Sequence, residues 1–399
     1  MSRHVEAGAM DPDLSSLDAL LDEEDADGYL VDDTSHNSTQ KYLSGFEAHD
    51  PFVTLYTPEE TVLLVSALEY GRAKKQSRAD EVRRVAEYDY RDLAAEYGPA
   101  EAKARVHASF LDDYGTSSVL TPERFPLGPA DGLRDRDVSV TPDHSDRVTE
   151  IRAAKTDEEI AHVRAAQEAN EASMRAAEDL IAAADVEDGI LVHDGEPLTS
   201  ERVKEEIEVT LLRHGCGLDD TIVACGADAA DPHDQGSGPL RADEAIIIDI
   251  FPRSKSTGYH ADMTRTFLKG EPSAEIREWF DLTHEALAAA LDAVEPGVTG
   301  EEVHDAVCDI YEGAGHDTLR ANPTAETGFI HSTGHGVGLD VHELPRLAPT
   351  GGELKPGHVI TVEPGLYDPS VGGVRIEDIA VVTEDGYENL TSYPVELTV

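Results

Sequence analysis

Five residues between positions 249 and 377 could together hold divalent cations. They occur in chain order as two aspartates, one histidine and two glutamates: Asp249, Asp262, His335, Glu363 and Glu377. Four carboxylates and one imidazole form an oxygen-rich ligand set, which suits two divalent cations better than one tetrahedral zinc ion. Because two cations that share a water lower its pKa, this set predicts a hydrolase that attacks with a metal-bridged hydroxide.

The segments around these residues predict two β-hairpins that would bring the carboxylates together. Asp249 ends the apolar run AIIID, and Asp262 lies in HADMTRTF, with the turn-forming PRSKSTG between the two segments. Glu363 in VITVEP and Glu377 in VRIED flank the turn-rich DPSVGG in the same way. Each hairpin would supply a pair of carboxylates, and the imidazole of His335 lies between the two hairpins in the sequence.

Acidic residues are so frequent in this chain that any single one is expected to be a solvated surface charge. Asp and Glu together make up 82 of the 399 residues. Asp249 fits that interpretation less well, because it follows three isoleucines at the end of a predicted buried strand. A carboxylate in such a position needs a cation or a hydrogen-bonding partner.

These segments resemble the pita-bread metallopeptidases, the family of methionine aminopeptidase, aminopeptidase P and prolidase. The resemblance rests on TGHGVGLDVHE (333–343), TVEPGLY (361–367), VRIED (374–378) and the ordered Asp, Asp, His, Glu, Glu pattern. It extends to DALLDEEDADGYLVDDTSHNSTQKYLSGF (18–46), which is similar to the domain that precedes the catalytic one in prolidases and creatinases. The separation between Asp249 and Asp262 is two residues longer than is usual in the family. A two-residue insertion leaves both side chains on their original faces.

The resemblance implies a role for each candidate residue. The five ligands would bind two divalent metal ions per subunit, Mn²⁺ first, with Co²⁺, Fe²⁺ or Zn²⁺ as alternatives, and Glu363 would also act as the general base. His331 and His342 would contact the scissile amide or its tetrahedral intermediate, and His233 would help to position the substrate. Arg375, two positions before the last ligand, would face the same cleft. It could bind a substrate carboxylate or pair with a structural acid, and the sequence leaves both possibilities open.

The proline-directed branch of the family fits this chain best. About 150 residues precede the predicted catalytic region, as in prolidase and aminopeptidase P and unlike the usual bacterial methionine aminopeptidase. We therefore expect hydrolysis of Xaa-Pro bonds in small peptides with proline at the second position, by a homodimer as the family implies. Two alternatives are a metal-dependent amidohydrolase of a small metabolite or compatible solute, as creatinase suggests, and a non-enzymatic pita-bread binding protein.

The strand and helix patterns in the sequence around these residues predict an α+β fold in two domains. Residues 1–150 predict a small α/β domain, with strands at 29–31, 52–56 and 61–68, a charged helix around 78–97, and further strands within 117–128 and 137–142. Residues 151–399 predict a pita-bread catalytic domain of antiparallel hairpins and helices, with helices at 157–184, 199–214, 273–293 and 299–314. Thr156 and Glu159 predict a capping box at the start of the first of these helices.

The charge balance predicts adaptation to concentrated salt. The chain has 32 basic and 82 acidic residues, which gives a net charge of −50. The acidic residues are spread along the chain while periodic apolar segments remain, which distinguishes it from disordered acidic proteins. Salt at 1 M shortens the Debye length to roughly 3 Å and screens self-repulsion. We therefore expect a halophilic source, with an acidic protein that binds basic partners as the alternative. Nucleic-acid binding is not expected, because it needs clustered Lys and Arg.

The lack of a signal-peptide pattern and the small number of cysteines favour a cytoplasmic protein. The first 20 residues lack the apolar core of a signal peptide, and no apolar run reaches the roughly 20 residues that span a bilayer. Met10 is an alternative start of translation, because residues 1–9 carry no structural pattern. Cys216, Cys225 and Cys308 give no disulfide framework. Cys216 and Cys225, which flank LDDTIVA, are predicted to be small buried residues, with a metal or redox role as the alternative.

Overall fold

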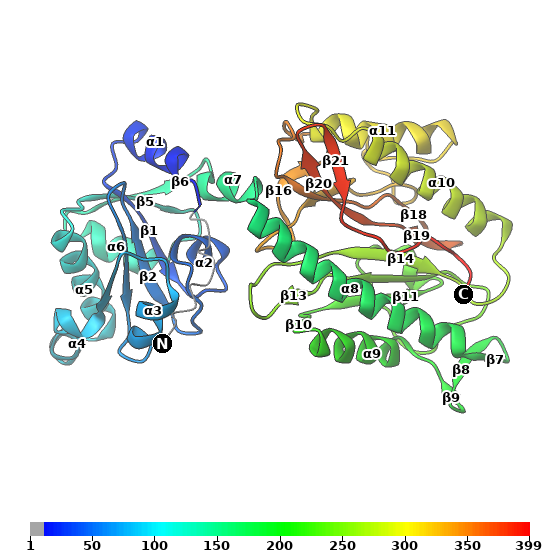
Figure 1. Ribbon diagram of the computed structural model, residues 1–399, viewed down its shortest axis with the longest axis horizontal. Helices are drawn as coiled ribbons and strands as arrows, with labels where there is room; N and C mark the ends of the chain where they lie inside the picture. The colour runs from blue at the N-terminus through cyan, green and yellow to red at the C-terminus, as the bar shows by residue number, and fades with distance from the viewer. Residues whose placement is uncertain (1–11) are drawn as a thin grey trace, which may run out of the picture. The chain divides into compact units, whose positions relative to one another are not determined.

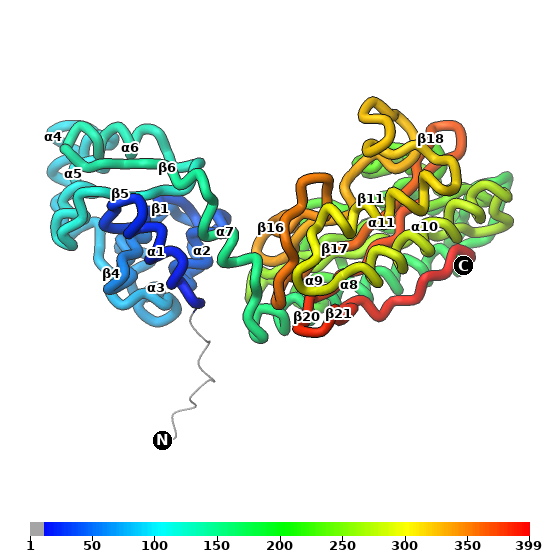
Figure 2. Tube along the Cα trace, turned by 90° about the horizontal axis from the view of Figure 1, so that it is seen from above, coloured from blue at the N-terminus to red at the C-terminus, as the bar shows by residue number. Residues whose placement is uncertain are grey.

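The computed structural model describes residues 12–399, so the predictions about Met10 and residues 1–9 lie outside the described residues. The chain forms two compact units, one ending at Arg152 and the other beginning at Ala153 (Figures 1 and 2). Between residues 12 and 399, no helix combines the length and the apolar character that a membrane span requires.

The first unit is built on a six-stranded mixed sheet in the order β4-β3-β2-β1-β5-β6. The central pairs β1–β2 and β2–β3 are antiparallel, whereas β1–β5, β3–β4 and β5–β6 are parallel. The strands are β1 (Gly28–Asp33), β2 (Phe52–Tyr56), β3 (Thr61–Val65), β4 (Glu81–Arg84), β5 (Ser118–Pro122) and β6 (Ser139–Asp143). The helices are α1 (Ser15–Glu23), α2 (Ser38–Ser44), α3 (Tyr70–Gln76), α4 (Tyr90–Tyr97), α5 (Pro99–Asp113), α6 (Leu127–Arg134) and α7 (Arg147–Ala153), with a short 3₁₀ helix at Val85–Tyr88.

Both faces of this sheet are covered, as the unbroken apolar run of β3 indicates. Successive side chains of a strand point to opposite faces. Val62 and Leu64 pack with Phe110 of α5 on one face, whereas Leu63 and Val65 pack in a second cluster on the other. This mixed α/β arrangement confirms the predicted class of the N-terminal part.

The prediction of a charged helix around residues 78–97 is wrong for the first half of this range. Glu81–Arg84 forms β4, a 3₁₀ turn follows at Val85–Tyr88, and only Tyr90–Tyr97 is α-helical. The segment EVRR pairs in parallel with β3 at the edge of the sheet. An edge strand offers unpaired N–H and C=O groups to a neighbouring segment, and this non-local pairing outweighs the local preference of charged residues for a helix.

The second unit contains four long helices and several small antiparallel sheets. The helices are α8 (Asp157–Ala183), α9 (Ser200–Arg213), α10 (Ala274–Asp292) and α11 (Gly300–Gly313), and a 3₁₀ turn lies at Asp228–Ala230. A three-stranded sheet has the order β11-β12-β14: β11 (Thr221–Cys225), β12 (Ile246–Ile250) and β14 (Met263–Phe267). A five-stranded sheet has the order β16-β15-β17-β20-β21: β15 (Gly334–Gly336), β16 (Glu343–Leu347), β17 (Val359–Val362), β20 (Asp378–Thr383) and β21 (Gly386–Asn389). The smaller sheets contain β7 (Asp185–Glu187), β8 (Ile190–His193) and β9 (Glu196–Pro197); β10 (Cys216–Gly217) and β13 (Arg253–Ser254); and β18 (Gly365–Asp368) and β19 (Gly372–Arg375).

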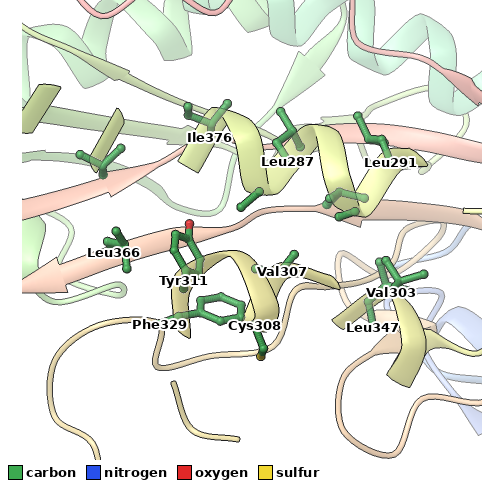
Figure 3. Close-up of a cluster of buried hydrophobic side chains, with 14 of the residues drawn as sticks. Leu287, Leu291, Val303, Val307, Cys308, Tyr311, Phe329, Leu347, Leu366 and Ile376 are labelled. Atoms are coloured by element: carbon green, nitrogen blue, oxygen red, sulfur yellow. The ribbon is translucent and has the colours of Figure 1, made fainter. Parts of the chain in front are cut away.

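Helices cover these sheets on the faces that carry apolar residues. In Figure 1, α10 and α11 lie above the strands of the second unit and α9 lies below them. Figure 3 shows Leu287 and Leu291 of α10 and Val307 of α11 in one buried cluster with Leu366 and Ile376 of the C-terminal hairpin. The strands therefore turn their other faces, which carry the polar residues, away from this core.

The helix boundaries predicted for this unit agree with the structure to within one residue. Their ends are set by local hydrogen bonds: the capping box of Thr156 and Glu159 is present at the start of α8. Another capping box, formed by Thr299 and Glu302, begins α11. Each box satisfies N–H groups that the first turn of a helix leaves without partners.

Candidate active site

The first predicted hairpin is present, and its register sets Asp249 and Asp262 on one face. β12 and β14 are antiparallel, with Asp249 opposite Thr264. Asp262 lies two positions before Thr264, so its side chain points to the same face. The opposite face of β12 carries Ile246, Ile248 and Ile250, which are buried in a core with α8 and α9. The connection between the two strands contains β13, which pairs with β10.

The second hairpin is interrupted, and its interruption carries the two glutamates. β17 pairs with β20 and β18 pairs with β19, both antiparallel. Glu363 directly follows β17 and Glu377 directly precedes β20, so both lie where one ladder ends and the other begins. The backbone N–H of Glu377 donates to the carbonyl of Thr264 at 3.0 Å, which joins this hairpin to the first one.

His335 lies in β15, in a segment that two glycines allow to pack closely. A Cβ atom at Gly334 would lie 2.0 Å from the carbonyl oxygen of Thr361, and one at Gly336 would lie 2.0 Å from that of Leu344. The His335 Nδ1 lies 3.2 Å from the carbonyl oxygen of Gly336. Because a carbonyl can only accept, Nδ1 donates; Nε2 then offers a lone pair in the neutral ring and donates to a carboxylate when the ring carries a second proton. That Nε2 atom lies 3.3 Å from Glu363 Oε1.

Three of the five residues bring ligand atoms within 4.8 Å of one another: Asp262, His335 and Glu377. The Oδ1 atoms of Asp249 and Asp262 are buried and have no hydrogen-bonding partner. Burial raises the pKa of Asp249, and burial together with the neighbouring carboxylates raises the pKa of Asp262 and of Glu377 well above the usual range. Without a cation, burial and mutual repulsion favour the protonated forms of these carboxyl groups, and a bound cation would favour their ionised forms.

Glu363 differs from the other three carboxylates in its pKa. Burial alone would raise that pKa, but the hydrogen bond from His335 and the charges of His335, His331 and Arg375 lower it to about 2. Thr361, two positions earlier in β17, also donates its hydroxyl to Glu363 Oε1 at 3.4 Å. Glu363 is therefore an ionised carboxylate at neutral pH.

Arg375 is buried, and each nitrogen of its guanidinium group donates a hydrogen bond within the protein. Its side chain donates to Asp249 Oδ2 at 2.7 Å, to the Thr264 hydroxyl at 3.2 Å, and to the Tyr367 hydroxyl at 3.1 Å. A further bond goes to the carbonyl of Pro232 at 3.2 Å. Of the two interpretations open from sequence, this geometry favours pairing with an acid over binding a substrate carboxylate.

His331 is held by both of its ring nitrogens. Nδ1 lies 2.7 Å from the carbonyl oxygen of Ser332, so it donates, and Nε2 accepts from the Tyr367 hydroxyl at 2.9 Å. Burial lowers the pKa of His331 to about 4, so the ring is neutral at neutral pH. The same Tyr367 hydroxyl accepts from Arg375, which makes it the link between His331 and the Asp249 pair.

His342 and His233 lie at the exposed side of the cluster. The ring of His342 is 4.0 Å from that of His335, centroid to centroid, at an interplanar angle of 63°. Partial burial and the proximity of His335 lower the pKa of His342. His233 is exposed, and its charge contributes to the lowered pKa values of both His331 and His342. His342 therefore lies beside the candidate ligand His335, and His233 lies close enough to His331 and His342 to affect their pKa values.

Sequence reasoning missed three polar residues that hold the candidate ligands in place. The hydroxyl of Thr264 donates to Glu377 Oε2 at 2.8 Å, and that of Thr361 accepts from the His335 N–H at 3.0 Å. Both threonines lie two positions from a candidate ligand in a strand, so the period of two would have found them. Tyr367 lies in the motif TVEPGLY, but no pattern in the sequence distinguishes its hydroxyl from that of a core tyrosine.

Two family models match this chain. A model described as metallopeptidase family M24 matches residues 161–384, and one described as the creatinase/prolidase N-terminal domain matches residues 14–110. The chain belongs to metallopeptidase family M24. Membership of M24 identifies it as a metal-dependent peptidase and agrees with the fold class and the family that the motifs predicted.

Several known M24 proteins and their relatives are similar over nearly the whole chain. The Xaa-Pro dipeptidase of Pyrococcus furiosus is 30% identical over 361 residues, which cover 89% of this chain and 91% of that protein. The prolidase structure from Pyrococcus horikoshii OT3 has a TM-score of 0.78 and 26% identity, covering 96% and 99% of the two chains. The X-Pro aminopeptidase structure from Thermotoga maritima has a TM-score of 0.77 and 27% identity, covering 94% and 98%. Similarity of the M24 fold thus does not separate dipeptidases from aminopeptidases.

Proposed function

We propose that this M24 chain hydrolyses Xaa-Pro peptide bonds, as a dipeptidase or an aminopeptidase, with two divalent cations held by Asp249, Asp262, His335, Glu363 and Glu377. The grouping of ligand atoms from Asp262, His335 and Glu377, with Glu363 in contact with His335, supports this proposal. Relatives also support this proposal, because proteins that are named for Xaa-Pro hydrolysis resemble the chain over most of its length.

The donor set fits divalent cations. Two carboxylate oxygens, Asp249 Oδ1 and Asp262 Oδ1, are buried without a protein partner, and the neutral ring of His335 would offer the lone pair of Nε2, which lies 3.3 Å from Glu363 Oε1. Oxygen-rich sites with one imidazole suit Mn²⁺, and Co²⁺, Fe²⁺ or Zn²⁺ can use the same donors. When bound, two such cations would lower the pKa of a water and polarise the scissile carbonyl.

Glu363 is the residue that we assign to proton transfer. It is ionised at neutral pH, and we assign it to accepting a proton from the attacking water and delivering that proton to the leaving amine. The Thr361 hydroxyl and the His335 ring both contact Oε1 of this carboxylate and so orient it.

His342 and His233 are the residues that we assign to the substrate. They are exposed at the open side of the cluster, where a peptide can reach them, and an imidazole N–H there could donate to the oxygen of the scissile carbonyl. Both ring nitrogens of His331 already have hydrogen-bonding partners, so the role that we assign to His331 is to hold the Tyr367 hydroxyl. Arg375 would orient Asp249 rather than bind a substrate carboxylate.

Hydrolysis of three peptides tests this function. Gly-Pro, Leu-Pro and Arg-Pro-Pro would be incubated with the protein and Mn²⁺ in about 2 M KCl, where surface repulsion is screened. Cleavage of the dipeptides alone would identify a dipeptidase, and release of Arg from the tripeptide would identify an aminopeptidase. Failure on all three, with metal demonstrably bound, would contradict the proposal and favour a small-metabolite amidohydrolase.

Two glutamate variants control this experiment. Glu363→Ala should lower kcat by about 10²–10⁴-fold, which is the range for loss of a general base. Glu384→Ala removes an exposed carboxylate outside the site and should leave the rate unchanged. Analytical ultracentrifugation under the same conditions would test the expected homodimer.

A further inference from the structure

The segment that leads into α8 contacts the loop that carries His342. Lys155 directly precedes Thr156, the N-cap of α8. Its ammonium group donates to the carboxylate of Glu343 and to the carbonyl of Ala153 at 3.3 Å. Both side chains of the Lys155–Glu343 pair are 1% exposed, so this is a fully buried ion pair between residues 188 positions apart.

The carboxylate of Glu343 is packed against the loop that precedes it. Glu343 directly follows His342 and begins β16. Its Oε2 accepts from the backbone N–H of Asp340 at 3.4 Å. A Cβ atom at Gly338 would lie 2.4 Å from Glu343 Oε1, so only glycine lets the backbone lie this close to the carboxylate. The carboxylate that pairs with Lys155 thus belongs to one end of the segment 338–343 and lies against the backbone of the other end.

The first turn of α8 also contacts the loop that carries Asp262. Glu159, the second member of the capping box, accepts from the Tyr259 hydroxyl at 2.6 Å. Tyr259 lies three positions before Asp262, and the next residue, His260, donates its N–H to the carbonyl of Gly338 at 2.8 Å. The two loops are therefore joined to each other and to the same helix end.

These contacts bear on the site because His342 has little other support. Its side chain is exposed, and it lies on an irregular segment between β15 and β16. A residue that must act on a substrate needs a fixed position, because a displacement of about 1 Å can cost a large part of the rate. Breaking a buried ion pair leaves an uncompensated charge, so the segment would have to move to hydrate it.

We propose that Lys155 and Glu343 are positioning residues that hold the 338–343 segment and thereby set His342 against His335. The Glu159–Tyr259 hydrogen bond supports the neighbouring loop in the same way. This inference rests on the proposed function only for the role given to His342, since the ion pair and the loop it holds can be tested without any substrate.

Hydrogen exchange of the metal-free protein tests the positioning role directly. In Lys155→Met, amides in the 338–343 segment should exchange at least about tenfold faster than in the wild type, because local opening controls exchange. Lys103→Met is the matched control, since it removes a lysine that pairs with the buried Asp32 in the first unit. It should leave the 338–343 segment unchanged. Unchanged exchange in Lys155→Met would overturn the proposal whether or not the protein is an Xaa-Pro peptidase.

Kinetics then test whether Lys155 acts through His342. Lys155→Met should lower kcat on the Xaa-Pro substrate about 10- to 100-fold with little change in KM and with metal content retained. In a His342→Ala background the same change should cost less than about threefold, because residues that act through one another are not additive. Equal losses in both backgrounds would contradict the proposal.

A paired variant covers the case in which Lys155→Met does not fold. Lys155→Met combined with Glu343→Gln removes both charges, so no charge is left buried alone. This double variant should fold, show the faster exchange of the 338–343 segment and show the lower kcat. A folded double variant with wild-type exchange and wild-type kcat would overturn the proposal.

Discussion

Arg375 holds one oxygen of Asp249 and leaves the other free for a ligand. Its Nη2 lies 2.7 Å from Asp249 Oδ2, whereas Oδ1 of the same carboxylate is buried and has no hydrogen-bonding partner. A carboxylate that is held at one oxygen has a fixed direction for the other. The pair therefore prepares Asp249 to bind a cation with Oδ1, and it explains why a buried arginine lies beside a cluster of candidate ligands.

Replacement of this arginine separates its two possible roles. Arg375→Lys should lower kcat/KM about 10- to 100-fold, because lysine cannot reproduce the branched contacts to Asp249, Thr264 and Tyr367. The loss should be equal on Gly-Pro and on its C-terminal amide. A loss confined to the free acid would instead show that Arg375 binds the substrate carboxylate. Arg277→Lys, at an exposed position on α10, serves as the control.

Loss of a candidate ligand should have opposite effects on metal binding and on metal-free stability. Burial and neighbouring carboxylates raise the pKa of Asp262. A raised folded-state pKa means that this group contributes stability at low pH, which is lost as the pH rises above the usual range of an aspartate. At pH 7 without metal, Asp262→Asn should therefore unfold at the same temperature as the wild type or a higher one.

The same variant should bind Mn²⁺ at least about 100-fold more weakly, because a direct ligand contributes more than the roughly 10- to 100-fold typical of a supporting residue. Calorimetric titration and thermal unfolding in a chelator measure the two effects. Asp281→Asn, on the exposed face of α10, should change neither. Unaltered Mn²⁺ affinity in Asp262→Asn would remove Asp262 from the ligand set.

His107 in the first unit should make stability sensitive to mild acid. It is 4% exposed, and burial lowers its pKa to about 4, with Asp32 acting in the opposite direction. Because the unfolded chain binds this proton near pH 6.5, stability is complete above that pH and falls as the pH decreases toward 4. The shift corresponds to at most about 3 kcal/mol.

Unfolding at a series of pH values in constant KCl checks this prediction. The free energy of unfolding of His107→Gln should depend less on pH between 6.5 and 4 than that of the wild type. His144→Gln provides the comparison, since His144 is exposed and pairs with the exposed Glu123. Parallel pH profiles for the wild type and His107→Gln would show that His107 does not contribute.

The net charge of −50 predicts a requirement for salt. Repulsion among acidic groups destabilises the compact state, and molar salt screens it. We expect the midpoint of thermal unfolding to rise steeply between about 0.1 M and 2 M KCl, and activity to rise with it. Circular dichroism with temperature measures this change. A midpoint that is unchanged in dilute buffer would refute the halophilic interpretation.

Much of the candidate site could be predicted because its residues follow local rules. Asp249 lies on β12, and Asp262, Glu363 and Glu377 each lie one residue from the end of a strand. The period of two and the turn residues were therefore enough to place each carboxylate pair on one predicted hairpin. The helix boundaries of the second unit also depend on local hydrogen bonds, such as the Thr156 capping box. The edge strand Glu81–Arg84 was mistaken for a helix because its partner strand, β3, is too far away in the sequence for a local pattern to reveal the pairing.

By itself, the sequence determined the family and the excess of negative charge, and it predicted the candidate ligands and the two hairpins that carry them. The tertiary structure decided which groups those residues face. Arg375 contacts Asp249, which is 126 positions away in the sequence, and Lys155 contacts Glu343, which is 188 positions away. Contacts at such separation depend on how whole hairpins and helices pack, and many side chains in a sequence could satisfy a buried charge equally well. Only the packed structure selects one partner, because a buried charge must be compensated within a few ångströms.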